Sequence, residues 1–326
     1  MKIYKTTAIA VVLSQIISCN SQNGNLHKDR KTNAEISVKE GGKWNGRKYE
    51  GGTWKNVKSH TLDPLHTDHS FDIRYEGPGW ESNKIAYRLY LDWRNAIDIF
   101  GKTSEKIILP EVGQDGFDSY HLKQDWGSDV LKVGKGVGLG SIARIVDNKM
   151  YHFETVDKTS AEVQNSAQKS TVIIDYKGWE TLNDKIDLKA NLSIYPNERF
   201  TKYTFTPSAP VSGIATGIVK VKTKDQSPVL LQKKSNSGKW AYIATFGNQS
   251  MFDDGLGMAV FYETSTVAEV KDGPFDHLLV FKPTTKPVTY YFTASWEKEQ
   301  DALKTQEEFV NYLNEKLNQL DSKNKL

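Results

Sequence analysis

The chain has 326 residues, of which 38% are hydrophobic and 25% charged, and its formal net charge is +3. This composition is that of a globular protein, and it excludes a disordered chain, a collagen-like chain and a protein built mainly of membrane spans. The near balance of charge gives no sign of a nucleic-acid partner, and the single cysteine excludes an internal disulfide.

Residues 1–19 have the pattern of a bacterial export signal. Two early lysines precede the apolar run Thr6–Ile17, which is too short for a permanent membrane span. The following Ser18-Cys19 completes a lipobox, the motif in which the cysteine is lipidated and becomes the new N-terminus. We therefore expect a lipoprotein anchored through Cys19 to the bacterial envelope, at the outer membrane on its periplasmic or surface side. An ordinary signal peptide with a chance cysteine is the alternative.

The next segment, residues 20–40, is rich in Asn, Ser, Gln, Lys and Gly and is predicted to be a flexible tether. The remainder, residues 41–326, is expected to form a single β-rich catalytic domain. No repeat of fixed period divides it.

Period-two patterns with β-branched and aromatic residues predict many short strands after the tether. Turn residues separate them, as at Asp147-Asn148 and at Asp272-Gly273-Pro274. The expected strands are Ser70–Tyr75, Ile85–Asp92, Ser141–Asp147, Lys149–Thr155, Ser170–Tyr176, Ile186–Ile194, Phe200–Phe205, Gly217–Thr223, Trp240–Phe246, Gly257–Tyr262, His277–Lys282 and Val288–Ala294.

Two stretches are predicted to be helical. Ser295–Leu320 has apolar residues at three- and four-residue spacing, and Gly127–Val133 is expected to form a short turn of helix in a loop. The pattern as a whole favours an all-β fold with one C-terminal helix. We expect a large two-sheet β-sandwich of the galactose-mutarotase-like supersandwich type.

The common cofactor motifs are absent from the sequence, and no cofactor is predicted. One histidine-rich segment is a weak candidate for a divalent metal site, because imidazole and carboxylate side chains that converge in a loop can bind such an ion. A solvated polar loop is the alternative interpretation, so we predict no metal site here. The segment contains His60, His66, His69, Asp63, Asp68 and Asp72.

The first candidate site lies in the expected strand at residues 85–92. Successive side chains of a strand point to opposite faces, so Arg88, Tyr90 and Asp92 share one face and Tyr87 lies on the other. A guanidinium group on such a face can bind a carboxylate through two hydrogen bonds. An arginine–aspartate ion pair on a solvent-facing surface is the alternative.

The second candidate site lies in a long connection between strands, where irregular segments of compact domains often carry function. Tyr120 and His121 are candidate acid–base groups, and Lys132 is a candidate for neutralising charge. We expect this segment to lie opposite the 87–95 strand. A surface loop without a catalytic role is the alternative.

Three motifs carry a resemblance to a known family. They are Gly77-Pro78-Gly79-Trp80-Glu81-Ser82, Tyr87-Arg88-Leu89-Tyr90-Leu91-Asp92 and Tyr120-His121-x-x-x-Asp125-Trp126-Gly127. From about residue 75 to the last helix, the chain resembles the bacterial domain of unknown function 4861, whose members are secreted and often encoded in polysaccharide-utilisation loci. More narrowly, it is similar to the oligosaccharide dehydratases of marine ulvan degraders.

The resemblance implies a carbon–oxygen lyase that removes water from the non-reducing-end uronate of an anionic, sulfated oligosaccharide and leaves a 4,5-unsaturated uronate. From the chemistry we expect a cation that neutralises the carboxylate, a base for the C5 proton and an acid for the leaving hydroxyl. The candidates are Arg88 or Arg94 for the carboxylate, His121 as base, Tyr87 or Tyr120 as acid, Trp80 and Trp126 for sugar stacking, and Lys132 for a carboxylate or sulfate.

Other functions remain open from the sequence. A polysaccharide lyase would cut chains internally by β-elimination, and a mutarotase could use the same fold. A non-catalytic glycan-binding lipoprotein would need the aromatic residues but not His121 or the tyrosines. A structural envelope protein would bind no sugar.

Overall fold

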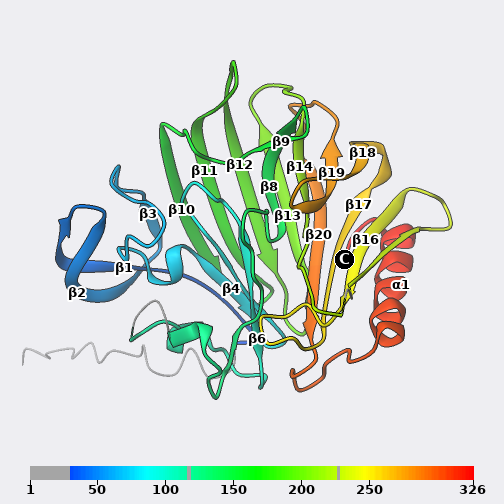
Figure 1. The fold of residues 1–326 in the computed structure, drawn as a ribbon, viewed down its shortest axis with the longest axis horizontal. Coiled ribbons are helices and arrows are strands. Elements are labelled where there is room, and N and C mark those ends of the chain that lie inside the picture. Colours follow the sequence, from blue (N-terminus) through cyan, green and yellow to red (C-terminus); the bar gives the residue numbers. More distant parts are fainter. Residues whose placement is uncertain (1–29, 116–118, 226–227) are drawn as a thin grey trace, which may run out of the picture. The chain divides into compact units, whose positions relative to one another are not determined.

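Strands account for almost all of the regular structure in the computed structural model of the chain, which describes residues 30–115, 119–225 and 228–326. The described residues contain twenty strands in three sheets and one α-helix (Figure 1). The predicted all-β fold with one C-terminal helix is confirmed, and a third sheet extends the expected two-sheet arrangement. Lys31–Leu326 forms one compact unit.

Neighbouring strands in every sheet pair in antiparallel fashion. The largest sheet has nine strands. Figure 1 shows its strands from β10 to β16 side by side. Its order is β15 (Val229–Lys234), β16 (Trp240–Gly247), β17 (Leu256–Glu263), β20 (Val288–Trp296), β13 (Thr201–Pro207), β12 (Asp184–Ile194), β11 (Ser170–Thr181), β10 (Lys158–Asn165) and β3 (Ser59–Thr61).

The two smaller sheets have six and five strands. The six-stranded sheet, which supplies most of the site described below, has the order β2 (Lys48–Val57), β1 (Thr32–Asn45), β4 (Gly79–Ser82), β5 (Ala86–Leu89), β6 (Ile97–Lys102) and β7 (Gly127–Asp129). The five-stranded sheet has the order β18 (Val267–Asp272), β19 (Asp276–Phe281), β14 (Ile214–Val219), β8 (Leu139–Val146) and β9 (Lys149–Tyr151).

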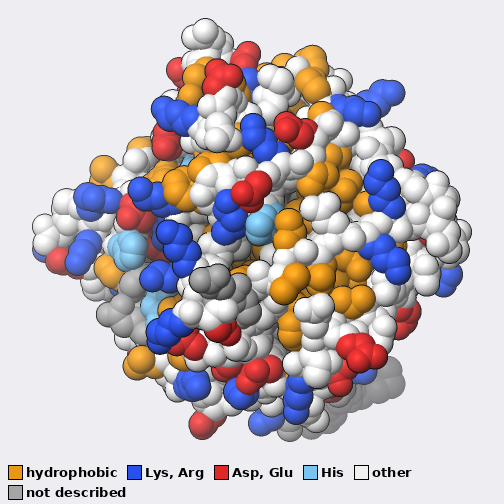
Figure 2. Space-filling model, turned by 45° about the vertical axis from the view of Figure 1, so that its right-hand side comes forward, with side chains coloured by type: hydrophobic (Ala, Val, Ile, Leu, Met, Phe, Trp, Pro, Cys, Tyr) orange, Lys and Arg blue, Asp and Glu red, His pale blue; other side chains and the backbone are white. Residues whose placement is uncertain are grey.

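The main hydrophobic core draws side chains from all three sheets, for example Ile36 from β1, Leu192 from β12 and Ile142 from β8. Short 3₁₀ turns interrupt the connections between strands. They are η1 (Arg74–Glu76), η2 (Leu109–Glu111), η3 (Ser119–His121) and η4 (Thr264–Thr266). Charged side chains of both signs are interspersed on the face that Figure 2 shows, with hydrophobic side chains gathered near its middle.

The C-terminal helix α1 spans Gln306–Lys323 and begins later than the predicted Ser295. Ser295 still belongs to β20, and the helix begins where Thr305 and Glu308 form a capping box. The buried face of α1 includes Phe309 and Leu313 and packs on β16 and β17. Figure 1 shows α1 against this end of the large sheet.

The N-terminal part of the predicted domain plan needs one correction. Residues 32–40, expected to be flexible tether, form the first part of β1 and pair with β2 and β4. Buried side chains such as Ala34 and Ile36 hold this stretch against the core, so ordered structure begins before the predicted boundary at residue 41. The predicted signal peptide and Cys19 lie outside the described residues. Within the described ranges, no helix is long and apolar enough to cross a membrane.

Two local predictions are also wrong. Gly127–Val133 is not a turn of helix, because Gly127–Asp129 pairs with β6 as strand β7. Ser70–Tyr75 is not a strand, because its backbone reverses at left-handed residues before η1. The predicted turn at Asp147-Asn148 is confirmed between β8 and β9, where both residues have positive φ, at 49° and 62°.

Candidate active site

Strand β5 places its odd and even residues in different environments. Tyr87 is fully buried, donates a hydrogen bond from its hydroxyl to the carbonyl of Arg199 at 2.8 Å, and accepts one from the amide of Ala294 at 3.2 Å. Trp80 of β4 is also fully buried and stacks on Tyr87 at 5.8 Å between ring centroids. The predicted roles of Tyr87 as an acid and of Trp80 in sugar stacking are therefore wrong, since both side chains belong to the core.

Arg88 occupies the opposite face of β5 and is 1% exposed. Its Nη2 donates to Asp98 at 2.7 Å and to Asp129 at 2.9 Å, while its Nη1 donates to the Tyr120 hydroxyl at 2.7 Å. The guanidinium group lies over the rings of Tyr90 and Tyr120, at 4.6 and 4.7 Å from their centroids. Arg88 is therefore a buried residue that holds Asp98, Asp129 and Tyr120 in position. Its predicted direct contact with a substrate carboxylate is not supported.

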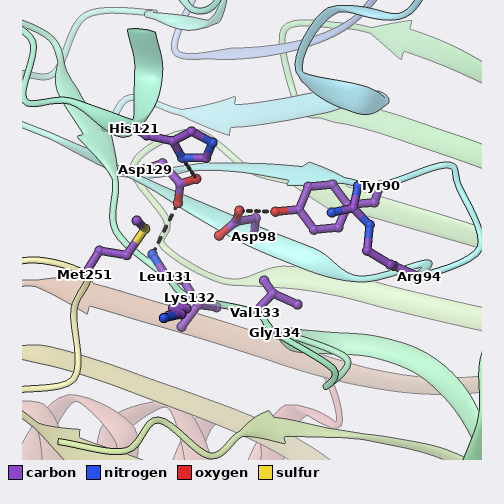
Figure 3. A pocket seen from close by; sticks show the side chains of 10 residues that line it. All are labelled: Tyr90, Arg94, Asp98, His121, Asp129, Leu131, Lys132, Val133, Gly134 and Met251. Atoms are coloured by element: carbon purple, nitrogen blue, oxygen red, sulfur yellow. Dashed lines mark hydrogen bonds and ion pairs between the residues drawn. The ribbon is translucent and has the colours of Figure 1, made fainter. Parts of the chain in front are cut away.

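His121 and Asp129 form a pair at the edge of this cluster (Figure 3). His121 ends the 3₁₀ turn η3, and its Nδ1 lies 3.0 Å from Oδ2 of Asp129 in β7. The Asp129 side chain is 1% exposed, whereas that of His121 is 30% exposed. A carboxylate at Nδ1 favours the tautomer that carries its proton there, which makes Nε2 the basic atom. His121 is thus a candidate general base, held within ion-pair distance of Asp129.

Tyr90 is a functional candidate that the sequence-based assignments omitted. Its hydroxyl donates to Oδ2 of Asp98 at 2.6 Å and accepts from Nη2 of Arg88 at 2.9 Å. Burial raises the pKa of Tyr90 well above its usual value, and the charge of Arg88 opposes that shift. Burial and the charge of Asp129 raise the pKa of Asp98. The signal for Tyr90 was its place on the same strand face as Arg88.

Arg94 and Lys132 supply positive charge at the mouth of the site. The Arg94 guanidinium lies 4.0 Å from the centroid of the Tyr90 ring and donates to Glu76 at 2.7 Å. It also donates to Asp92 at 2.8 Å, and its side chain keeps 16% exposure. Lys132 is exposed. Both residues line the pocket described below, Lys132 as an exposed residue and Arg94 with its charge paired to Glu76 and Asp92.

These side chains enclose a pocket of about 160 Å³. The predicted meeting of the His121 segment with the 87–95 segment is confirmed, because residues of both line it. We call it the His121 pocket. Its lining residues are Tyr90, Arg94, Asp98, His121, Asp129, Leu131, Lys132, Val133, Gly134 and Met251 (Figure 3).

Two predicted site residues lie behind the pocket instead of in its lining. Tyr120 is 1% exposed, with its hydroxyl bound to Arg88 and its ring next to Phe100. Burial raises the pKa of Tyr120 above its usual value, so the hydroxyl stays protonated. Trp126 is half-buried and packs edge-on against Phe100 at 5.7 Å. Neither position supports direct contact with substrate.

Backbone strain is concentrated beside this pocket. His69, Phe71, Tyr75 and Glu76 have φ between 41° and 69°, and Asn95 in the β5–β6 turn has φ of 44°. Side chains disfavour this left-handed region, so each such residue costs about 1 kcal/mol or more. The strained segment brings Oε1 of Glu76 to Arg94, and Oε2 of Glu76 within 3.6 Å of Arg88. Clustered strain of this kind is typical of functional sites.

The histidine-rich segment forms a second polar cluster. His66 Nδ1 lies 2.9 Å from Asp72, and the His69 side chain contacts Asp68 at 3.2 Å. His60 lies in β3, and burial lowers its pKa. Among the described residues, no group of three histidine, cysteine or acidic side chains is arranged to hold a metal ion.

Comparisons with known proteins place the chain in a family. A putative aldose 1-epimerase from Klebsiella pneumoniae subsp. pneumoniae MGH 78578 is similar at 10% identity and a TM-score of 0.36, with 76% of this chain and 84% of that one covered. The 4-alpha-glucanotransferase from Thermococcus litoralis is similar at 12% identity and a TM-score of 0.32, covering 73% and 41%. No curated protein matches the sequence. A family model described as "Domain of unknown function (DUF4861)" matches residues 14–326, and the chain belongs to this family.

Proposed function

We propose that the protein is a carbohydrate-active dehydratase that removes water from the non-reducing-end uronate of ulvan-type oligosaccharides and leaves a 4,5-unsaturated uronate. The observation that carries the proposal is the His121–Asp129 pair, which opens into a pocket bordered by Arg94 and Lys132. This arrangement combines an oriented base with cations that can hold a carboxylate. The resemblance of the sequence motifs to oligosaccharide dehydratases supports the choice of reaction.

The reaction is a β-elimination across C4 and C5 of the uronate. Nε2 of His121 takes the C5 proton, and the electron pair of the C–H bond forms the C4–C5 double bond. Negative charge builds on the carboxylate during this step, and Arg94 and Lys132 stabilise it. Interactions that strengthen as charge develops lower the barrier, at about 1.4 kcal/mol for each factor of ten in rate.

The C4 hydroxyl leaves as water once a proton reaches it. Tyr90 supplies this proton, because its hydroxyl belongs to the hydrogen-bonded group of Asp98 and Arg88 and its ring lines the pocket. The guanidinium of Arg88 stabilises the phenolate left on Tyr90, which regains a proton from solvent as His121 releases one after the product leaves. His121 and Tyr90 thus replace the earlier pairing of His121 with Tyr87 or Tyr120.

The test incubates the purified protein with uronate-ended oligosaccharides and follows the products by mass spectrometry. A dehydratase yields a product lighter by one water at unchanged chain length, together with ultraviolet absorption of the conjugated enoyl carboxylate. Shortened chains would instead identify a polysaccharide lyase. Unchanged substrate, with binding retained, would identify a glycan-binding protein, and either result would overturn the proposal.

We also propose that the protein is exported and anchored to the bacterial envelope through a lipid on Cys19. The lone cysteine directly follows the apolar run of a signal sequence and supports this proposal. Cys19→Ala should block processing or release the protein from the membrane fraction. Unchanged processing and membrane partitioning would contradict the anchor.

A further inference from the structure

A larger pocket lies beyond the β5–β6 turn. It has a volume of about 940 Å³, and we call it the Trp93 pocket. The turn contributes to both pockets: Tyr90 and Arg94 line the His121 pocket, whereas Leu91, Asp92 and Trp93 line the Trp93 pocket. Consecutive residues of one turn therefore line the two pockets.

Trp93 offers a flat aromatic surface to this pocket. It is 38% exposed, which is high for so large a hydrophobic side chain. Its Nε1 donates to Asp68 at 3.2 Å, and its ring meets the ring of His152 edge-on at 5.9 Å. These contacts fix the orientation of the indole. An oriented, exposed tryptophan is suited to stacking on the apolar face of a sugar ring.

The charges around the Trp93 pocket disfavour an anionic ligand, although Asp157 is paired with Lys185 at 2.8 Å. Exposed carboxylates of Asp63, Glu154 and Asp157 line it, with Lys158 as the basic residue of the described lining. Carboxylates accept hydrogen bonds from hydroxyl groups but repel other carboxylates and sulfates. The pocket therefore suits an uncharged ring with many hydroxyl groups, whereas the His121 pocket has Arg94 and Lys132 for an acidic ring.

A chain of polar side chains joins the two pockets. Asp68 accepts from Trp93 and contacts His69 at 3.2 Å. His69 in turn lies 3.9 Å from Glu76, which accepts from Arg94 at 2.7 Å. The His69 side chain is 48% exposed and that of Asp68 is 27% exposed. The surface between the pockets is thus polar and accessible, as contact with an extended oligosaccharide requires.

We propose that the Trp93 pocket is a second subsite that binds an uncharged sugar unit of the oligosaccharide whose terminal uronate occupies the His121 pocket. This proposal rests on the proposed function for the identity of the chain that spans both pockets. It makes Trp93 a specificity-determining residue that selects longer oligosaccharides with a neutral unit.

The kinetic test compares Trp93→Ala with wild type on a series of uronate-ended oligosaccharides of increasing length. We expect KM to rise roughly tenfold for the longer substrates, with kcat unchanged, because the lost contact binds ground state and transition state alike. Disaccharide kinetics should not change. Trp44→Ala, in the β1–β2 hairpin, is the matched control and should match wild type at every length. An equal KM for wild type and Trp93→Ala at all lengths would overturn the proposal.

A binding test separates this proposal from the reaction itself. Ligand-observed NMR with methyl α-L-rhamnoside as the uncharged probe and glucuronate as the acidic probe needs no turnover. We expect Trp93→Ala to lose the neutral probe only and Lys132→Met to weaken glucuronate only. Trp93-dependent binding of the neutral probe without any dehydration would refute the proposed function but support the subsite. Binding of glucuronate that depends on Trp93, or no binding of the neutral probe, would overturn the subsite.

Discussion

Two histidine–aspartate pairs with similar separations occur in different parts of the molecule; His66 and Asp72 are hydrogen-bonded, whereas His121 and Asp129 are within ion-pair distance. His121 Nδ1 lies 3.0 Å from Asp129, and His66 Nδ1 lies 2.9 Å from Asp72. Both histidines line a pocket, but the His121 side chain is 30% exposed, whereas the His66 side chain, at the Trp93 pocket, is only 3% exposed. Nε2 of His66 is buried without a hydrogen-bond partner among the described residues. The histidine of such a pair therefore becomes a candidate base only where its outer nitrogen can meet a substrate.

The surroundings of the two pairs differ as well. Asp129 also binds Arg88, which connects His121 to the buried group around Tyr90. Asp72 accepts a hydrogen bond from the Ser70 hydroxyl at 2.6 Å and thus belongs to a loop of short local contacts. We propose that the first pair takes part in the chemistry and that the second holds the strained segment beside the site.

The largest expected effect on kcat is that of replacing His121, and comparison with His66 separates the two roles. His121→Ala should lower kcat by about a hundredfold or more with little change in KM, because it removes the base but not the groups that bind the carboxylate. His66→Ala, the matched control, should keep kcat within about threefold of wild type. Steady-state kinetics on a uronate-ended oligosaccharide measures both. Loss of activity in His66→Ala with retention in His121→Ala would reverse our assignment of the two pairs.

A second prediction compares two tyrosines on opposite faces of the same segment. Tyr90→Phe should lower kcat by about tenfold to a hundredfold, because the ring stays in place while the acidic hydroxyl is lost. Tyr87→Phe should retain kcat but lower the free energy of unfolding by about 1–3 kcal/mol, since the buried amide of Ala294 loses its acceptor. Kinetics and urea denaturation of both variants check this pair. Equal kcat in the two variants would remove Tyr90 from the mechanism.

A third, smaller effect concerns the charge at the mouth of the His121 pocket. Lys132→Met should raise KM about fivefold, the equivalent of about 1 kcal/mol for a solvent-exposed charge, and the change should shrink in high salt. Lys135→Met is the control, because Lys135 is also exposed but lies over Phe275. Titration of KM against salt concentration distinguishes the two. A salt-independent rise in KM would indicate a packing role for Lys132.

The sequence predicted which residues of the site share a face of one strand, but not which other strands bring side chains to that face. Period-two alternation correctly put Arg88 and Tyr90 on one face and Tyr87 on the other, as the hydrogen bonds of these residues show. It could not show that Arg88 is buried, because Asp98 and Asp129 reach it from β6 and β7 through sheet pairing. The burial of Trp80 likewise depends on packing against Tyr87.

The same contrast applies to the fold. The C-terminal helix was predictable because its apolar spacing is a local pattern. Its start was predicted too early, because Ser295 belongs to β20 and the capping box of Thr305 and Glu308 makes Gln306 the first helical residue. The hairpin of β1 and β2 was missed because its strands are rich in glycine and lysine, residues with low strand propensity. The reversal at His69–Glu76 requires left-handed residues that β-like patterning does not reveal.

Replacing His66 has the smallest expected effect on activity. Its measurable consequence is a loss of unfolding free energy that depends on pH. Burial alone would raise the pKa of Asp72, but the hydrogen bond and charge of His66 outweigh it and lower the pKa below the usual value near 4. A carboxyl group whose pKa is lower in the folded state stabilises the protein above its unfolded pKa, and that stability is lost as pH falls through the folded value. His66→Ala should therefore cost about 1–3 kcal/mol of unfolding free energy at pH 7 and clearly less near pH 3. Urea denaturation of wild type and His66→Ala at both pH values measures the difference. An equal loss at both pH values would show that His66 stabilises the loop by packing alone.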